Sequence, residues 1–278
     1  MTPQANWLVA IIGSGEIGTD LMIKIRGSDG PLRVVAMADN DVRIVFDTSS
    51  AGPAQTGARV IDLTPAAGGP WCVPAVNLDN YLDAPYLNMA TGDVQATVPI
   101  VAAVAQSGIV SYAEIVSSIS SAAVGPDTRA AIDSLTQITA AAVQVVGGAQ
   151  RGKAMMIINP AVPPMMMRST VYCLVAGDAD HQRIESDVLG MVDKVRTYIP
   201  GYRLKQRIQF EGFSIAHPLY IPETGKFIGT RVTILLEVAG AADYLPAYAG
   251  NLDIVTSAAK ATAEGIAARA IETAGLPT

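Results

Sequence analysis

The feature that most constrains the fold is a glycine-rich turn close to the N-terminus. An apolar run at 7–12 leads into the segment GSGEIG at 13–18, and apolar residues then recur at helical spacing. Gly13 and Gly15 allow a tight turn and the close approach of a pyrophosphate, while Gly18 lets the helix and the strand pack closely. The order strand, turn, helix therefore predicts the opening βαβ unit of a nucleotide-binding lobe.

The next stretch is too short to complete such a lobe. Apolar runs at 33–38 and 42–47 predict strands with only three residues between them, and a third run follows at 59–63. A parallel crossover needs a dozen or more residues. The connector 48–58 is rich in Gly, Pro, Ser and Thr and has no amphipathic stripe. The sequence therefore predicts a lobe that lacks the helices of a complete adenosine site.

Helices and strands alternate in the remainder of the chain. Helical periodicity predicts helices at 95–106, 127–147, 180–198 and 253–271. Apolar runs predict strands at 110–117, 154–158, 170–175, 202–210 and 231–238. The last two strands alternate between apolar and polar residues, which is typical of a sheet with one covered face. A mixed lobe rich in strands thus follows the opening lobe, and the closing helix can return to the first lobe.

The composition narrows the class of protein. Half of the 278 residues are apolar, 16% are charged and the mean hydropathy is +0.33, a surplus of apolar residues that predicts a subunit interface. The net charge of -6, the pI near 4.9 and the lack of a basic cluster argue against a nucleic-acid partner. No apolar run approaches the roughly 18 residues of a membrane helix, so we expect a cytoplasmic protein without a membrane segment.

The cysteines and histidines give no sign of a metal site. Cys72 and Cys173 are too few for a disulfide framework and have no metal-ligand spacing. We therefore expect two buried thiols, surface or structural roles for His181 and His217, and no bound metal.

Seven segments resemble the acylating acetaldehyde dehydrogenases, bacterial enzymes that are paired with a 4-hydroxy-2-oxovalerate aldolase. The segments are 9–15, 61–67, 112–116, 145–149, 151–154, 200–204 and 244–254. They occur in order from near the first residue to near the last, so the resemblance covers nearly the whole chain. It implies an α/β protein with a truncated Rossmann-like parallel-sheet lobe at 1–106 and 250–278, and a mixed α+β dimerisation lobe, the former catalytic lobe, at 107–249.

The resemblance also shows where the catalytic nucleophile should be. The family oxidises acetaldehyde or propionaldehyde with NAD and coenzyme A, through a cysteine in a Thr-Cys-Gly-Gly-Gln-Ala-Thr segment. That segment is TGDVQAT at 91–97 in this chain, so Gly92 stands at the nucleophile position and Asp93 follows it. Glycine has no side chain to attack an aldehyde, and a carboxylate beside it repels an incoming thiolate. Cys72 lies in a WCVP run typical of core or turn, and we do not expect it to replace the nucleophile.

A second catalytic position has changed as well. The family carries its catalytic aspartate in a Met-Arg-Asp-Thr segment, which is Met-Arg-Ser-Thr at 167–170 in this chain. Ser169 cannot serve as that general base near neutral pH, because its hydroxyl ionises far too high. The resemblance therefore implies that acylating activity is lost.

The cofactor positions differ from the family pattern. Glu16 replaces an asparagine in the glycine turn and places a carboxylate where a pyrophosphate would lie, although it also suits the positive end of the helix dipole. Asp127 and Ala131 replace a glycine and an asparagine of the nicotinamide-side segment, whereas Asn251, a cofactor contact in the family, is retained. The residues expected to form a vestigial cofactor site, with weak NAD binding or none, are Gly13, Gly15, Gly18 and Asn251.

Two main functions are consistent with these losses. In the first, the chain is a homodimeric pseudo-dehydrogenase that binds and supports or activates an aldolase-like partner, as the family's dehydrogenase does. In the second, the pocket serves a non-thioester reaction, with Asp93 as acid or base and Ser169, Gln95 or Arg168 as binding groups. A residual NAD-dependent aldehyde dehydrogenase is a third reading. Asp93 distinguishes the first two, because a strongly shifted pKa in a closed pocket favours chemistry and an exposed helix cap favours a scaffold.

Overall fold

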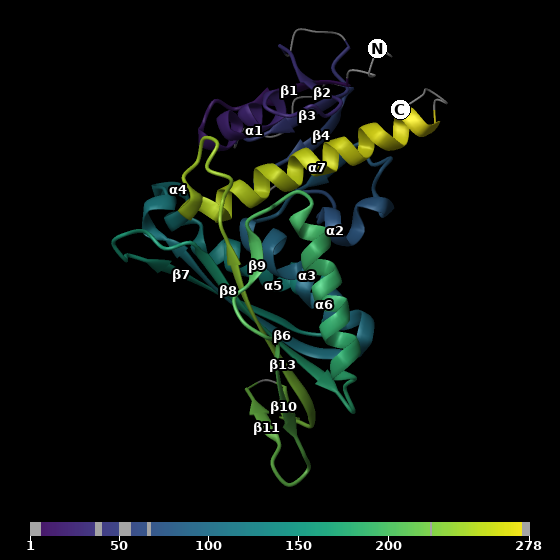
Figure 1. Ribbon diagram of the computed structural model, residues 1–278, viewed down its shortest axis with the longest axis vertical. Coiled ribbons are helices and arrows are strands. Elements are labelled where there is room, and N and C mark those ends of the chain that lie inside the picture. The colour runs from purple at the N-terminus through teal and green to yellow at the C-terminus, as the bar shows by residue number, and fades with distance from the viewer. Residues whose placement is uncertain (1–6, 37–40, 50–56, 66–67, 223, 274–278) are drawn as a thin grey trace.

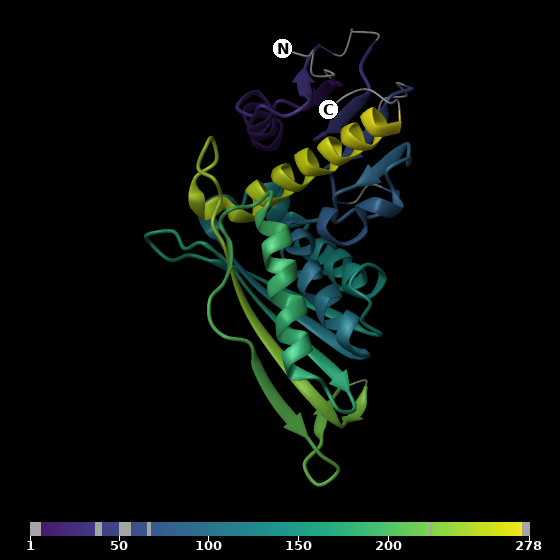
Figure 2. The ribbon, with the colours of Figure 1, turned by 45° about the vertical axis from the view of Figure 1, so that its right-hand side comes forward.

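The computed structural model describes residues 7–36, 41–49, 57–65, 68–222 and 224–273. Two sheets lie at opposite ends of the molecule, and the long helix α7 (Gly250–Thr273) runs between them (Figures 1 and 2). In these ranges every helix is too short or too polar to span a bilayer.

The first sheet is parallel, with the strand order β2-β1-β3-β4-β5. Its strands are β1 (Trp7–Ile12), β2 (Leu32–Val34), β3 (Ile44–Asp47), β4 (Arg59–Asp62) and β5 (Tyr86–Asn88). Helix α1 (Glu16–Arg26) connects β1 to β2, and the short helices α2 (Pro74–Asn77) and η1 (Leu78–Asn80) lie between β4 and β5. No helix lies between β2 and β4 in the described part of the chain, as the short connectors predict. The order 2-1-3-4-5 is one that occurs among doubly wound sheets.

Helix α7 packs on both halves of the molecule. It contacts α1 on the side of the first sheet and α3 (Gly92–Ser107) on the side of the second. Lys24 of α1 donates to Asp20 of the same helix and, at 2.7 Å, to Asp253 of α7, and all three side chains are buried. Helix α7 therefore packs on the first lobe, as expected, and a buried ion triad joins it to α1.

The second sheet is mixed, with the order β10-β13-β8-β6-β7 and with β9 paired to β13. Its strands are β6 (Val110–Ser120), β7 (Gly152–Asn159), β8 (Met167–Ala176), β9 (Tyr202–Leu204), β10 (Gln209–Phe213) and β13 (Gly229–Val238). Helices α3, α5 (Ile132–Val145) and α6 (His181–Arg196) lie on one side of it (Figure 2). No described helix covers the other side, which we call the open face; there Lys153, Met155 and Ile157 of β7 are exposed.

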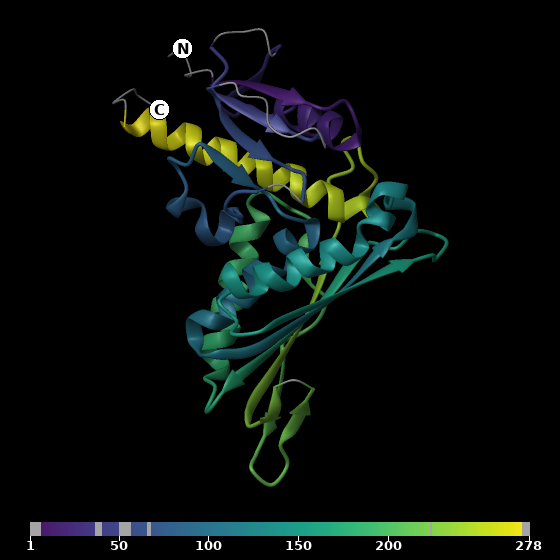
Figure 3. The ribbon, with the colours of Figure 1, turned by 180° about the vertical axis from the view of Figure 1, so that it is seen from behind.

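The structure corrects several predicted elements. The single helix expected at 127–147 is two helices, α4 (Pro126–Ala130) and α5, because the backbone leaves the helical region at Ala131. The strand expected at 202–210 is interrupted between β9 and β10, and the one expected at 33–38 ends at Val34. The hairpin of β11 (Leu219–Ile221) and β12 (Gly225–Phe227) is not predicted from the sequence and lies at the end of the molecule farthest from the first sheet (Figure 3).

Candidate functional site

The glycine turn follows β1, at the sheet edge where doubly wound proteins bind their ligands. Gly13 has a φ of +104°, and a Cβ there would stand 2.3 Å from Thr48 Oγ1, while a Cβ on Gly18 would stand 2.2 Å from the Gly13 carbonyl oxygen. Gly15 begins α1 without a side-chain cap and has open space around it. The turn therefore retains the shape that a pyrophosphate needs, and the exposed carboxylate of Glu16 in the first helical turn opposes it.

A buried row of polar side chains lies along the same edge of the first sheet. Asp47, Asp62 and Asn88 end three neighbouring strands in register, and each is 0% exposed. Asp62 accepts a hydrogen bond from Tyr86, and Asp47 Oδ2 has no partner within the described ranges. This row is not predicted from the sequence, although a polar residue at the end of each buried strand is a signal that could have found it. Two carboxyl groups at this edge add to the unfavourable surroundings of an anionic cofactor.

Gly92, at the former nucleophile position, is the first residue of α3 and lies against the start of α7. A Cβ built on Gly92 would stand 2.2 Å from the backbone oxygen of Asn251, closer than real Cβ atoms approach. Asn251 is 9% exposed, and its Oδ1 has no partner in the described residues. The backbone therefore closes this position to a side chain, and the structure brings Gly92 together with Asn251.

Asp93 lies in the first turn of α3 but does not cap the helix. Thr91 is the cap and accepts a hydrogen bond from Val94 N at 3.0 Å, so the reading of Asp93 as a cap is wrong. Asp93 is 4% exposed, and its burial raises its pKa to about 6 against the lowering effect of a hydrogen bond with Ser117. Ser117 Oγ in turn lies 2.8 Å from Ser169 Oγ. Asp93 and Ser169 thus converge on Ser117, a residue that is not predicted from the sequence.

Gln95 and the cysteines have structural positions. The Gln95 side-chain amide donates to the backbone oxygens of Cys72 and Met89, both at 2.8 Å. The thiols of Cys72 and Cys173 are buried, and burial raises the pKa of each to about 12. Neither thiol forms a thiolate near neutral pH, so neither replaces a nucleophile at position 92.

Arg168 lies on the open face of the second sheet, opposite to Ser169, because adjacent strand residues point to opposite faces. Its Nε lies 3.0 Å from Glu237 Oε2, and Arg203 and Lys205 contact the same carboxylate. Burial raises the pKa of Glu237, but the hydrogen bonds from these three cations outweigh burial and lower the pKa to about 2. The grouping of Arg168 with the buried carboxyl group of α3 is therefore wrong.

The histidines do not form a metal centre. Within the described ranges there is no group of three or more His, Cys, Asp and Glu side chains that could hold a metal ion. His181 stacks on Phe210 with ring centroids 4.2 Å apart, and His217 is exposed.

Comparisons with known proteins identify the family to which the sequence is similar. The family described as "Prokaryotic acetaldehyde dehydrogenase, dimerisation" matches residues 92–246. The chain is 50% identical over 315 residues to the "Probable inactive acetaldehyde dehydrogenase 1" of Mycolicibacterium vanbaalenii, with 100% of both chains covered. It is 50% identical over 308 residues to "Acetaldehyde dehydrogenase 1" of Mycobacterium ulcerans, over 96% of this chain and 92% of that relative.

Among solved structures, aspartate semialdehyde dehydrogenase II from Vibrio cholerae, complexed with ASA, matches with a TM-score of 0.59 and 13% identity over 96% of this chain and 99% of that chain. This likeness supports the α/β fold alone. The sequence matches go further, and the chain belongs to the acetaldehyde dehydrogenase family.

Proposed function

We propose that this chain is a pseudo-dehydrogenase: a homodimeric subunit without thioester chemistry that binds, and supports or activates, an aldolase-like partner. The contact between Gly92 and the Asn251 backbone carries the proposal, because the former nucleophile position has no room for a side chain. The buried thiols of Cys72 and Cys173 offer no substitute. A relative that matches over its whole length and is named as an inactive acetaldehyde dehydrogenase is consistent with a lost reaction.

The open face of the second sheet supplies the proposed homodimer contact. Met155 and Ile157 are 41% and 50% exposed on it, and Val116 of β6 and Leu235 of β13 lie on the same face. Apolar side chains gathered on one exposed surface favour burial against another subunit. The dimerisation-family match at 92–246 contains this whole sheet, which supports the proposal.

We infer that NAD binds weakly or not at all. Gly13, Gly15 and Gly18 would hold its pyrophosphate, and bound NAD would supply a hydride acceptor. Glu16 and the buried carboxyl groups at the same sheet edge work against an anionic ligand, and the described lobe has no helix between β2 and β4. In a calorimetric titration we expect no saturable heat at millimolar NAD or NADH. Saturation at micromolar cofactor would contradict this inference.

Two assays test the central proposal. The purified chain is incubated with acetaldehyde or propionaldehyde, NAD and coenzyme A, and we expect no thioester product; turnover comparable to that of a cysteine-bearing relative would refute it. The tagged chain is also co-expressed with a 4-hydroxy-2-oxovalerate aldolase-like protein. We expect the two to co-purify and the aldolase-like protein to lose solubility or activity when expressed alone. An aldolase-like protein that is soluble and active alone and does not co-purify with this chain would contradict the scaffold role.

One observation favours the second function, an enzyme with a repurposed pocket. Asp93 is buried, its pKa is raised to about 6, and Ser117 and Ser169 line up beside it. A base with a pKa near neutral is suited to remove a proton next to a carbonyl group.

The test for that function incubates the protein with acetaldehyde or pyruvate in D₂O. NMR then measures how fast deuterium replaces the α-hydrogens. A carboxylate at position 93 would take the proton and return a deuteron, so exchange in the wild type that disappears in Asp93→Asn would support chemistry. Equal rates in the two proteins would leave the pseudo-dehydrogenase as the function.

A further inference from the structure

A short arm extends from the second sheet at the end of the molecule farthest from the first sheet (Figure 3). It comprises residues 214–222 and 224–228, which include β11 and β12 and lie between β10 and β13. Ile221 and Phe227 of the arm form a buried cluster with Leu174 of β8, a residue of the open face. This cluster fixes the arm to one end of the open face, so the arm extends that surface.

The arm exposes large apolar side chains to solvent. Ile215 is 84% exposed, Tyr220 is 72% exposed and Ile228 is 47% exposed. A single exposed apolar residue is ordinary on a protein surface, but several within one short segment favour burial against another molecule. The arm therefore has the composition of a contact region.

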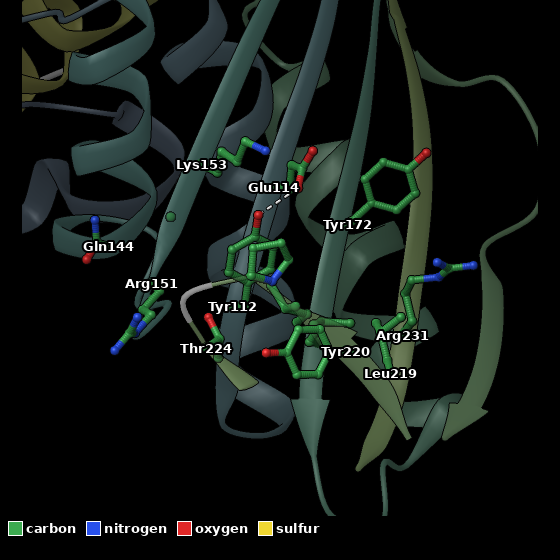
Figure 4. Close-up of a pocket in the computed structure, with 14 residues that line it drawn as sticks. Tyr112, Glu114, Gln144, Arg151, Lys153, Tyr172, Leu219, Tyr220, Thr224 and Arg231 are labelled. Atoms are coloured by element: carbon green, nitrogen blue, oxygen red, sulfur yellow. Dashed lines mark hydrogen bonds between the residues drawn. The ribbon is translucent and has the colours of Figure 1, made fainter. Parts of the chain in front are cut away.

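The arm and the sheet border a cavity of about 780 Å³ (Figure 4). Tyr220 lines it from the arm, and Tyr112 and Lys153 line it from the sheet. Met155 and Ile157 of the proposed dimer contact lie on the same face of β7 as Lys153. The cavity therefore lies on the surface that the dimer covers, and a second copy that fills it gains the packing contacts that an empty space forfeits.

The exposed apolar residues of the sheet supply only part of a stable contact. Each partner of a stable dimer buries about 800 Å², whereas Met155 and Ile157 are 41% and 50% exposed. The contact therefore extends toward one end of the open face. The end away from the arm carries the cluster of three cations around Glu237, which a partner would have to desolvate. At the arm end Arg231 is paired with Glu211, and the apolar side chains of the arm add contact area.

We propose that the arm of each subunit packs against the second subunit, so that Ile215 and Tyr220 are buried in the homodimer. This proposal rests on the homodimer of the proposed function and adds a contact region to that of Met155 and Ile157. The dimerisation-family match at 92–246 contains the arm as well as the sheet, which supports it. In a two-fold dimer each arm makes the same contact, so one substitution affects two contacts.

The test measures the dissociation constant of the dimer by sedimentation velocity over a dilution series of the full chain. Ile215→Ser and Tyr220→Ser replace exposed side chains, so both variants are expected to fold, which circular dichroism checks. Each should raise the dissociation constant by about tenfold or more, because each removes two buried apolar contacts from the dimer. Leu189→Ser changes a 46% exposed residue of α6 and is the matched control, with an unchanged dissociation constant.

A fluorescent probe on the arm gives a second readout. Lys226 is exposed on β12 and pairs with Tyr220 of β11, and both native cysteines are buried. An environment-sensitive fluorophore attached to the Lys226→Cys variant therefore reports on the surroundings of the arm. We expect its emission to shift to shorter wavelength as the protein concentration rises through the dissociation constant.

The outcomes separate the arm contact from the homodimer itself. A wild-type chain that is monomeric at all concentrations would refute both. A dimeric wild type whose dissociation constant is the same in both arm variants would overturn the arm contact alone. Arm variants that stay dimeric but no longer co-purify with the aldolase-like protein would assign the arm to that partner, which also overturns the proposal.

Discussion

At the residue scale, the backbone of another segment closes the former nucleophile position to a side chain. The carbonyl oxygen of Asn251 occupies the space that a Cβ at position 92 would need. Asp93, the next residue, brings a carboxyl group into the interior and leaves its Oδ1 without a partner among the described residues. A buried carboxylate with an empty hydrogen-bonding position destabilises the fold. Position 92 thus restricts chemistry, and position 93 links stability to pH.

Restoring the cysteine should not restore the reaction. Gly92→Cys and Gly92→Ala both introduce a Cβ that must displace the Asn251 backbone, so each should lower the free energy of unfolding by about 1 to 3 kcal/mol. Gly190→Ala is the matched control, because Gly190 is an exposed residue of helix α6 with nothing within 4 Å of the added Cβ, and the change should raise stability by about 0.5 to 1 kcal/mol. Urea unfolding measures both. A stable Gly92→Cys protein that forms acetyl-coenzyme A would contradict the closed position.

Asp93→Asn should stabilise the protein at high pH only. The pKa of Asp93 is raised from 3.8 to about 6 in the folded state, so the folded state holds its proton more tightly and stability falls as pH rises from about 4 to 6. Above pH 6 the ionised side chain costs about 3 kcal/mol, which asparagine avoids. Unfolding at pH 8 and pH 3.5 should show a gain at pH 8 that shrinks at pH 3.5. The exposed control Glu185→Gln should change little at either pH, and an Asp93→Asn effect independent of pH would disprove the assignment.

At the scale of elements, regular patterns are predictable from sequence and long-range contacts are not. The periodicity of apolar residues predicts α6, and the glycine segment at 13–18 predicts the turn before α1, because both signals depend on neighbouring residues. The break at Ala131 and the interruption between β9 and β10 depend on how the chain turns over the second sheet, and no local pattern marks them. The resemblance of residues 91–97 to a family segment identifies Gly92 as the former nucleophile position. Its contact with α7 and the role of Ser117 depend on long-range packing, which neither that resemblance nor a local pattern reveals.

The ion triad between α1 and α7 is expected to hold the two helices together. Lys24→Met removes the cation and leaves two buried carboxyl groups, on Asp20 and Asp253, without their partner, so the free energy of unfolding should fall by about 3 to 5 kcal/mol. Lys260→Met removes a more exposed ion pair with Glu264 and should cost less than about 1 kcal/mol. Thermal unfolding of both variants provides the comparison, and equal losses would show that the triad has no special role.

At the scale of the whole molecule, the two sheets differ in the surface that they offer to a ligand or to another subunit. The first keeps a glycine turn with carboxyl groups around it, and the second offers a broad open face. In the proposed function, two subunits associate through the open face of the second sheet, because helices already cover the other side of that sheet within one chain. The oligomeric state should therefore be sensitive to changes on the open face and insensitive to changes on the helices.

The paired substitution Met155→Lys and Ile157→Lys should convert the dimer to a monomer. Both side chains are exposed on the open face, and charges there would have to be desolvated in a sheet-to-sheet contact. Leu189→Lys changes a 46% exposed residue of α6 and should leave the dimer intact. Light scattering after size-exclusion chromatography gives the mass of each. A dimer that survives the paired substitution would place the contact elsewhere.

The position of α7 has a consequence for how the protein is made. The strands of the first sheet end at Asn88, but the helix that packs beside them begins at Gly250, roughly 160 residues later. At ordinary translation rates of about 5 to 20 residues per second, the nascent first sheet waits about 8 to 30 s for this helix. During that interval one side of it is open to chaperones and to other chains, so slow elongation after residue 88 should raise misassembly more than slow elongation before it.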